Sequence, residues 1–174
     1  MATADRDVEL RAWMDHLAIQ TLIFRYSDAV TRCDWDQCLG VFSPGAVWES
    51  PALGLRFDSP ISFVDMLRGS SSEVLVQTPH APVISMDGSD RAQASTTIHE
   101  LTRGLAPVEN TLRAEGSQIN FEQYGIYFDD IARMDGDWKF THRVFVPIYV
   151  SSDSVTGEVL TPRTGLIRPI AKPS

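Results

Sequence analysis

The sequence contains only two cysteines among 174 residues, and it has no run of ligands typical of a metal site. Cys33 and Cys38 are five positions apart, a spacing that matches no common metal motif. A glycine-rich phosphate loop, an HExxH motif and a Cys/His cluster are all missing. We therefore expect two reduced, packed cysteines, and neither a metal nor any other cofactor.

Basic residues are also scarce. The chain has 15 Lys and Arg against 23 Asp and Glu, which gives a net charge of −8. Nucleic acids and anionic membranes are bound by clustered Lys and Arg, so we expect neither as a partner. The longest apolar runs fall far short of the ~20 residues that a membrane span requires. The N-terminal MATADRDVELR lacks the pattern of a signal peptide, which predicts a cytoplasmic protein.

The length and the 43% hydrophobic content indicate one globular domain over residues 1–174, with a core from about 7 to 150 and a tail from 151 to 174. Apolar residues recur at spacings of three and four from about Asp7 to Arg32, and they predict a long helix. Asp34 and Ser59 are typical N-caps, and they predict two shorter helices.

The period of the apolar pattern changes from 3.6 to 2 after the third predicted helix. Asp135-Gly136 lies between two alternating runs and indicates a tight hairpin. Helices followed by long antiparallel strands predict an α+β fold, with the helices on one face of a curved sheet. The expected strands are 46–51, 74–86 (interrupted by prolines), 92–103, 118–134 and 138–150.

Three stretches of this chain resemble the SnoaL-like branch of the nuclear transport factor 2-like superfamily. They are AIQTLIFRYSDAVTRCDWDQCLGVFSPGAVWES, TPHAPVISMDGSDRAQASTTIHE and YGIYFDDIARMDGDWKFTHRVF. The resemblance implies a cone of curved, mostly antiparallel sheet whose open end is covered by N-terminal helices, with one deep apolar pocket. Members of the branch include dehydratases, a dehydrochlorinase and polyketide cyclases, and they form dimers, trimers or tetramers.

The resemblance also implies catalytic positions. Dehydratase-like members pair a histidine from the strand after the third helix with an aspartate near the end of the first helix, often assisted by a tyrosine five positions earlier. These positions match His80, Thr31 and Tyr26. Threonine can orient an imidazole but carries no charge to stabilise imidazolium. His80 could therefore act as a weaker base, another carboxylate could replace the aspartate, or the pocket could only bind.

Five further residues are candidates for the pocket. His99 could converge with His80 from a neighbouring strand as a second catalytic histidine. Arg143, Tyr124, Asn120 and Trp48 are expected substrate contacts, Arg143 because a related dehydratase places a functional arginine nearby. His99 and Glu100 are adjacent in a strand and must face opposite sides.

The leading hypothesis is a cofactor-independent acid–base enzyme, of the dehydratase/lyase or isomerase type, acting on a hydrophobic cyclic molecule such as a polyketide, steroid or terpenoid. Hydrolysis or polyketide cyclisation in the same pocket is an alternative. A non-catalytic small-molecule-binding protein is another, supported by Thr31. We expect a homo-oligomer, a trimer or dimer.

Overall fold

The computed structural model describes residues 2–166 of the chain. Three helices precede or interrupt the first strands: α1 (Ala2–Arg32), α2 (Trp35–Gly40) and α3 (Pro60–Gly69). None of the helices in the described residues is long and apolar enough to cross a membrane. Two short 3₁₀ segments, η1 (Pro51–Leu53) and η2 (Arg163–Leu166), complete the helical part.

The predicted caps are confirmed. The Asp34 carboxylate accepts the backbone N–H of Gln37 at 3.1 Å at the start of α2, and Ser59 accepts that of Ser62 at 3.2 Å at the start of α3. Cys33 ends α1 because it adopts a left-handed conformation with φ of 59°. Both cysteines are free, as expected.

Seven strands form one sheet in the order β2-β1-β7-β6-β5-β3, with β4 also paired to β5. The β1–β7 pair is parallel and every other pair is antiparallel. This confirms the α+β class and the curved, mostly antiparallel sheet, which does not close. The strands are β1 (Phe42–Ser50), β2 (Leu55–Phe57), β3 (Val74–Pro79), β4 (Val83–Asp87), β5 (Arg91–Leu105), β6 (Gln118–Met134) and β7 (Asp137–Ser152).

Two details differ from the sequence-based expectation. The prolines between 79 and 82 split the strand expected over 74–86 into β3 and β4, although both pair with β5. The three-residue β2 was not expected, because it is too short to show an alternating pattern. The expected tail begins inside β7, and residues 167–174 lie outside the described part.

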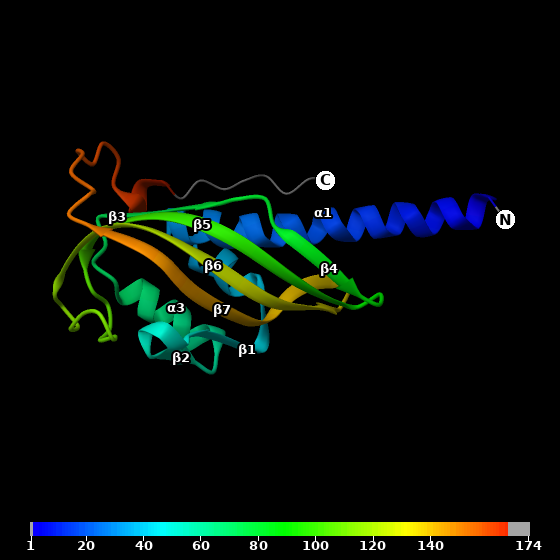
Figure 1. Cartoon of the computed structure of the whole chain (residues 1–174), viewed down its shortest axis with the longest axis horizontal. Helices are drawn as coiled ribbons and strands as arrows, with labels where there is room; N and C mark the ends of the chain where they lie inside the picture. Colours follow the sequence, from blue (N-terminus) through cyan, green and yellow to red (C-terminus); the bar gives the residue numbers. More distant parts are fainter. Residues whose placement is uncertain (1, 167–174) are drawn as a thin grey trace.

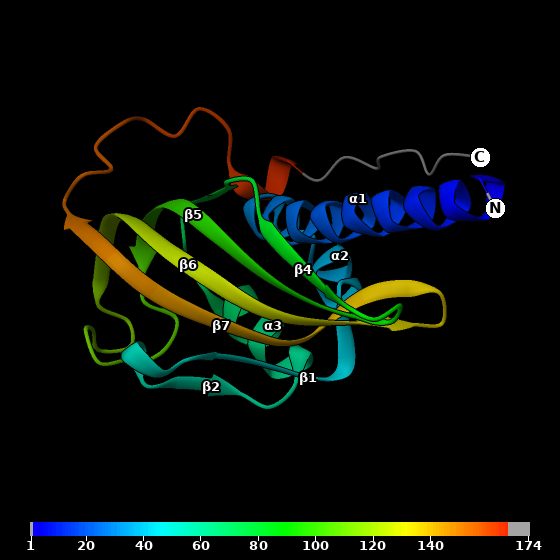
Figure 2. The same cartoon turned by 45° about the vertical axis from the view of Figure 1, so that its right-hand side comes forward.

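The helices cover the inner face of the bent sheet, and the N-terminal half of α1 projects beyond the end of the strands (Figures 1 and 2). The C-terminal half of α1 contributes Ile19, Ile23, Tyr26 and Val30 to the core, and each of these side chains is 1% exposed or less. These side chains recur every three or four residues and so share one helix face. The core packs against this face of α1. The cavity lies beyond the core, toward the other end of the sheet.

Candidate functional site

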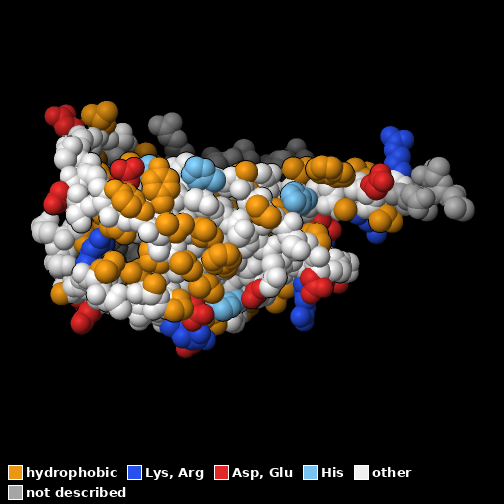
Figure 3. All heavy atoms as spheres, in the orientation of Figure 1, with side chains coloured by type: hydrophobic (Ala, Val, Ile, Leu, Met, Phe, Trp, Pro, Cys, Tyr) orange, Lys and Arg blue, Asp and Glu red, His pale blue; other side chains and the backbone are white. Residues whose placement is uncertain are grey.

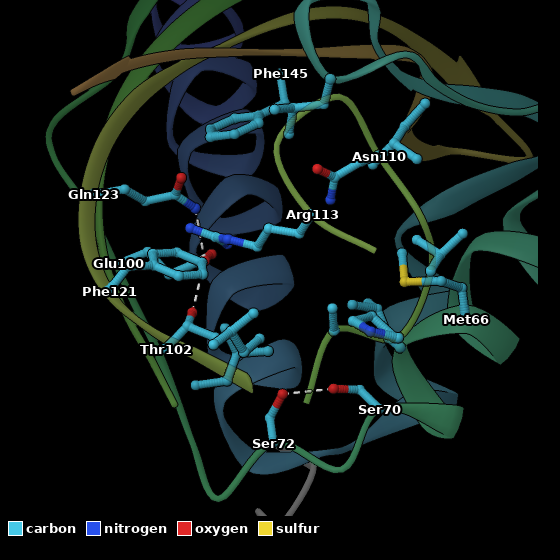
Figure 4. Close-up of a pocket in the computed structure, with 18 of the residues that line it drawn as sticks. Met66, Ser70, Ser72, Glu100, Thr102, Asn110, Arg113, Phe121, Gln123 and Phe145 are labelled. Atoms are coloured by element: carbon cyan, nitrogen blue, oxygen red, sulfur yellow. Dashed lines mark hydrogen bonds between the residues drawn. The ribbon is translucent and has the colours of Figure 1, made fainter. Parts of the chain in front are cut away.

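A cavity of about 150 Å³ lies between the inner face of the sheet, α3 and the loop that joins β5 to β6. Figure 4 shows side chains from all three regions converging on it. Most of the wall is apolar, so water inside has few partners and polar groups in the wall interact strongly. The main apolar wall residues are Trp48, Phe63, Leu75, Phe121 and Phe145.

One carboxylate, that of Glu100, lies in this apolar wall and is 7% exposed. Its Oε2 accepts a hydrogen bond from Gln77 Nε2 at 2.7 Å. Its Oε1 accepts one from Gln123 Nε2 at 2.7 Å and one from Thr102 Oγ1 at 2.9 Å. Three neutral donors from β3, β5 and β6 therefore fix the carboxylate in one orientation without neutralising its charge.

Sequence reasoning missed Glu100 as a site residue, although a signal was present. Ala92, Ala94 and Ile98 are small or apolar at even positions of β5, and all three are buried. Side chains alternate between the two faces of a strand, so this parity places position 100 on the inner face. Gln77 in β3 and Gln123 in β6 are the direct strand partners of Glu100, so their side chains lie on the same inner face.

Arg113 reaches the cavity from the loop after β5 (Figure 4). Its guanidinium carbon lies 4.0 Å from the centroid of the Phe121 ring. Burial lowers the pKa of Arg113, and the negative charge of Glu100 opposes that shift. The side chain is a half-buried cation packed on an aromatic face, as cation–π geometry favours.

Two tyrosine hydroxyls meet at the bottom of the cavity. Tyr26 from α1 and Tyr127 from β6 lie 3.3 Å apart, oxygen to oxygen, and both line the cavity. Burial raises the pKa of Tyr127 to about 12 and that of Tyr26 well above its ordinary value. Both phenols therefore stay protonated at neutral pH and can donate hydrogen bonds.

Beneath these rings lies a fully buried ion pair. Arg143 Nε is 2.9 Å from Asp129 Oδ1, and Arg143 Nη2 donates to Oδ2 at 3.2 Å. The guanidinium also lies within 4.2 Å of the ring centroids of Tyr26, Tyr127 and Phe140. Arg143 is 0% exposed and supports the tyrosines from behind, which corrects its expected place as a substrate contact.

Three other expected site residues lie in or beside the cavity. Tyr26 and Trp48 line it, and Trp48 Nε1 is a buried donor without a partner among the described residues. Thr31 lies at the C-terminal end of α1, where its hydroxyl accepts the backbone N–H of Gln77 at 3.1 Å. The structure thus brings Thr31 next to β3, but the polar side chain that β3 presents to the cavity is Gln77.

The expected position of His80 in the cavity needs correction. His80 is exposed in the connection between β3 and β4, where its backbone N–H donates to Thr97 O at 2.9 Å. His80 comes after the end of β3 at Pro79 and before β4 begins at Val83, so no strand holds its side chain against the inner face of the sheet. Thr31, the position matched to the family's aspartate, holds no titratable group.

The other expected residues face away from the cavity. His99 Nε2 is 2.7 Å from Glu122 Oε1 on the outer face of the sheet, and its ring stacks on Tyr124 at 4.7 Å. Asn120 Oδ1 accepts the backbone N–H of Val155 and holds the segment after β7. These placements follow from parity, since positions 99, 120, 122 and 124 face opposite to the cavity-lining positions 100, 119, 121 and 123.

A SnoaL-like domain model matches residues 11–144, more than three quarters of the chain. The chain belongs to the SnoaL-like family. A comparison with curated protein sequences gave no match.

Solved structures share the fold at low sequence identity. A hexachlorocyclohexane dehydrochlorinase, LinA type 2, superposes with a TM-score of 0.70 at 14% identity, over 88% of this chain and 97% of that one. A candidate scytalone dehydratase from Novosphingobium aromaticivorans gives 0.67 at 17% identity, over 83% and 91%. LinA type 3 from Novosphingobium barchaimii gives 0.68 at 15%, over 88% and 99%. These similarities support the same architecture.

Proposed function

We propose that the protein is a cofactor-independent acid–base enzyme, of the dehydratase/lyase or isomerase type, acting on a small apolar cyclic molecule. The observation that carries this proposal is a single oriented carboxylate, Glu100, in a mostly apolar cavity. Structural neighbours named as a dehydrochlorinase and a candidate dehydratase support the reaction class. Glu100 takes the role of base that the sequence suggested for His80.

Glu100 retains one site for a substrate proton. An ionised carboxylate offers about four lone-pair positions, and three are used by Gln77, Gln123 and Thr102. The free lone pair on Oε2 can accept a proton from a C–H or O–H bond of the substrate. A positioned general base of this kind contributes about 10²–10⁴ in rate.

The paired phenols supply the complementary acid side. Because Tyr26 and Tyr127 remain protonated, the phenol that accepts the hydrogen bond between them can donate its own O–H to a substrate carbonyl, hydroxyl or leaving group. Trp48 Nε1 and Gln77 Oε1, both without partners among the described residues, are further polar contacts. Thr31 accepts the backbone N–H of Gln77, so it positions Gln77 and does not itself contact the substrate.

Cavity size narrows the substrate. The volume of about 150 Å³ equals that of an engineered cavity that holds benzene. It favours a single-ring compound over a steroid or a multi-ring polyketide, which would require the loop over residues 106–117 to move outward.

The test is incubation of the purified protein with single-ring hydroxy ketones, cyclic alcohols and halogenated cyclohexanes, followed by mass spectrometry. Loss of water or of hydrogen halide, or an isomer of unchanged mass, is the expected outcome. Glu100→Gln keeps the side-chain shape, and it should lower kcat/KM for that substrate by at least about a hundredfold. His80→Ala and Glu122→Gln, both outside the cavity, are matched controls and should retain activity. Equal activity in Glu100→Gln would refute the assignment of the base.

A binding protein is the second candidate, favoured by one observation. Thr31 occupies the position matched to the family's catalytic aspartate, and it carries no charge. Retention of a panel compound without chemical change would support this candidate. A gain of water would instead indicate a hydrolase.

We further propose that the chain forms a homo-oligomer, a dimer or trimer, through the outer face of the sheet. Apolar side chains gather over this face in Figure 3. Phe128, Val146, Ile148 and Tyr149 are 37–61% exposed there, and a patch of this kind on a soluble protein marks an interface. Light scattering should give a multiple of 19.4 kDa, and Ile148→Glu should reduce it. Leu160→Glu, in the tail, is the control; a monomeric wild-type protein would refute the proposal.

A further inference from the structure

Arg113 is a cavity cation whose counter-charge is not bonded to it. Three of the about four lone-pair positions of the Glu100 carboxylate accept hydrogen bonds from Gln77, Gln123 and Thr102. Among the described residues, no carboxylate lies within ion-pair distance of the Arg113 guanidinium, which packs on Phe121 instead. The guanidinium of Arg113 has five N–H donors, and the cavity beside it has room for a ligand oxygen that accepts from them.

The loop holds Arg113 in place. Asn110 and Arg113 pair through their backbones, with N–H to O distances of 2.9 and 3.3 Å. Thr111 fixes this turn to the opposite wall of the cavity, because its N–H donates to Leu53 O and its hydroxyl to Ala52 O. The guanidinium is therefore pre-positioned before any ligand arrives, which makes its electrostatic effect larger.

The charges in the wall suggest how the cavity is used. Glu100 and Arg113 are the only charged side chains among the residues that line the cavity. If a ligand transfers a proton to Glu100, the net charge of the site does not change. The negative charge moves from the carboxylate to the ligand oxygen, where Arg113 can stabilise it.

We propose that the cavity binds single-ring phenols or enolisable ketones as their phenolate or enolate anions, with Arg113 as the counter-ion. The ligand O–H or α-C–H bond breaks, the proton forms an O–H bond with Glu100 Oε2, and the electron pair remains on the ligand with its charge on oxygen. This inference rests on the proposed function for turnover, but the binding it predicts can be measured without any turnover.

The test uses para-nitrophenol, whose phenolate absorbs at longer wavelength than the phenol. The absorbance of the bound compound, followed against pH, reports the ratio of phenolate to phenol. Arg113→Gln should decrease this ratio by about tenfold or more, a shift of one pKa unit, and Arg113→Lys should restore part of it. Glu100→Gln removes the group that accepts the ligand proton, so the bound phenol must release its proton to solvent, and the ratio should depend more steeply on pH than in the wild type. Arg91→Gln is the control: Arg91 is an exposed arginine of β5, and this variant should give the same ratio as the wild type.

Two outcomes would overturn the inference. One is an unchanged phenolate ratio in Arg113→Gln, and the other is no binding of para-nitrophenol at millimolar concentration. The proposed function fails separately. A phenolate signal that depends on Arg113, without turnover of any panel compound, would retain the inference and reject the enzyme. Turnover that survives in Arg113→Gln would retain the enzyme and reject the inference.

Discussion

His99 and Glu100 are neighbours in β5, yet they belong to two different polar clusters on opposite faces of the sheet. On the outer face, His99 contacts Glu122 at 2.7 Å, and the two side chains are 26% and 37% exposed. On the inner face, Glu100 is 7% exposed and accepts hydrogen bonds from two amides and a hydroxyl. The residue types suggest chemistry on the outer face, whereas the surroundings favour it on the inner face.

The difference between the faces is a difference in dielectric. Water screens the contact between His99 and Glu122, so the contact contributes little to stability. On the inner face, Glu100, Asp129 and Arg143 lie among apolar side chains, where each charge must be held by hydrogen bonds or by an opposite charge. Function and stability should therefore both respond to inner-face substitutions and remain nearly constant for outer-face ones.

The largest stability effect should come from breaking the inner ion pair. Asp129→Ala leaves Arg143 as an uncompensated charge among Tyr26, Tyr127 and Phe140. Removal of one partner from a buried pair costs about 3–5 kcal/mol. Urea unfolding followed by tryptophan fluorescence would measure it.

Glu122→Ala is the matched variant on the outer face of the same strand. It breaks the His99 pair and should cost less than about 1 kcal/mol, because exposed pairs contribute little. Equal losses for the two variants would contradict the comparison between the faces.

The sequence predicted the fold well because the fold depends on periodicity, caps and turns, each of which is local. The helix over α1, the Asp34 and Ser59 caps and the Asp135-Gly136 turn were all visible in the pattern. The site was predicted less well. Tyr26 and Trp48 line the cavity as expected, but His80, His99, Asn120 and Tyr124 do not.

Parity and register explain the missed residues. A shift of one residue turns a strand side chain to the other face, so the sequence did not show that Gln77 lies in the cavity and His80 does not. Arg113 could not have been predicted, because it comes from an irregular loop whose position depends on contacts with Leu53 and Ala52, far away in sequence. The sequence shows which residue types could do chemistry, but it does not show toward which face of the sheet each side chain points.

A smaller loss is expected at Gly125, where β6 approaches Phe145 on the inner face. A Cβ at this position would lie 2.3 Å from Phe145 Cε2 and 2.6 Å from Cζ. Gly125→Ala should displace this ring into the cavity and cost about 1–3 kcal/mol. Thermal unfolding should show the loss. Gly45→Ala, whose Cβ would contact no neighbour within 4 Å, is the control and should change the melting temperature much less.

The smallest effect concerns pH and again separates inner from outer carboxylates. Burial raises the pKa of Asp129 from 3.8 to about 6 in spite of Arg143. The folded state therefore binds this proton more tightly than the unfolded state. The resulting stabilisation is complete below the unfolded pKa and is lost as the pH rises through about 6. Between about pH 7.5 and about pH 5.5 the free energy of unfolding should increase by about 1 kcal/mol from this group.

Asp129→Asn tests the origin of that slope, because it removes the titrating group and keeps the shape of the side chain. Glu49 on the outer side provides the contrast: hydrogen bonding from His142 lowers its pKa, so its stabilisation is present above its ordinary pKa and is lost only at more acidic pH. Urea unfolding of both proteins at the two pH values should give a slope that is smaller in Asp129→Asn. An identical slope would mean that Asp129 stays ionised throughout, held by Arg143, and that burial beneath the tyrosines does not control its protonation.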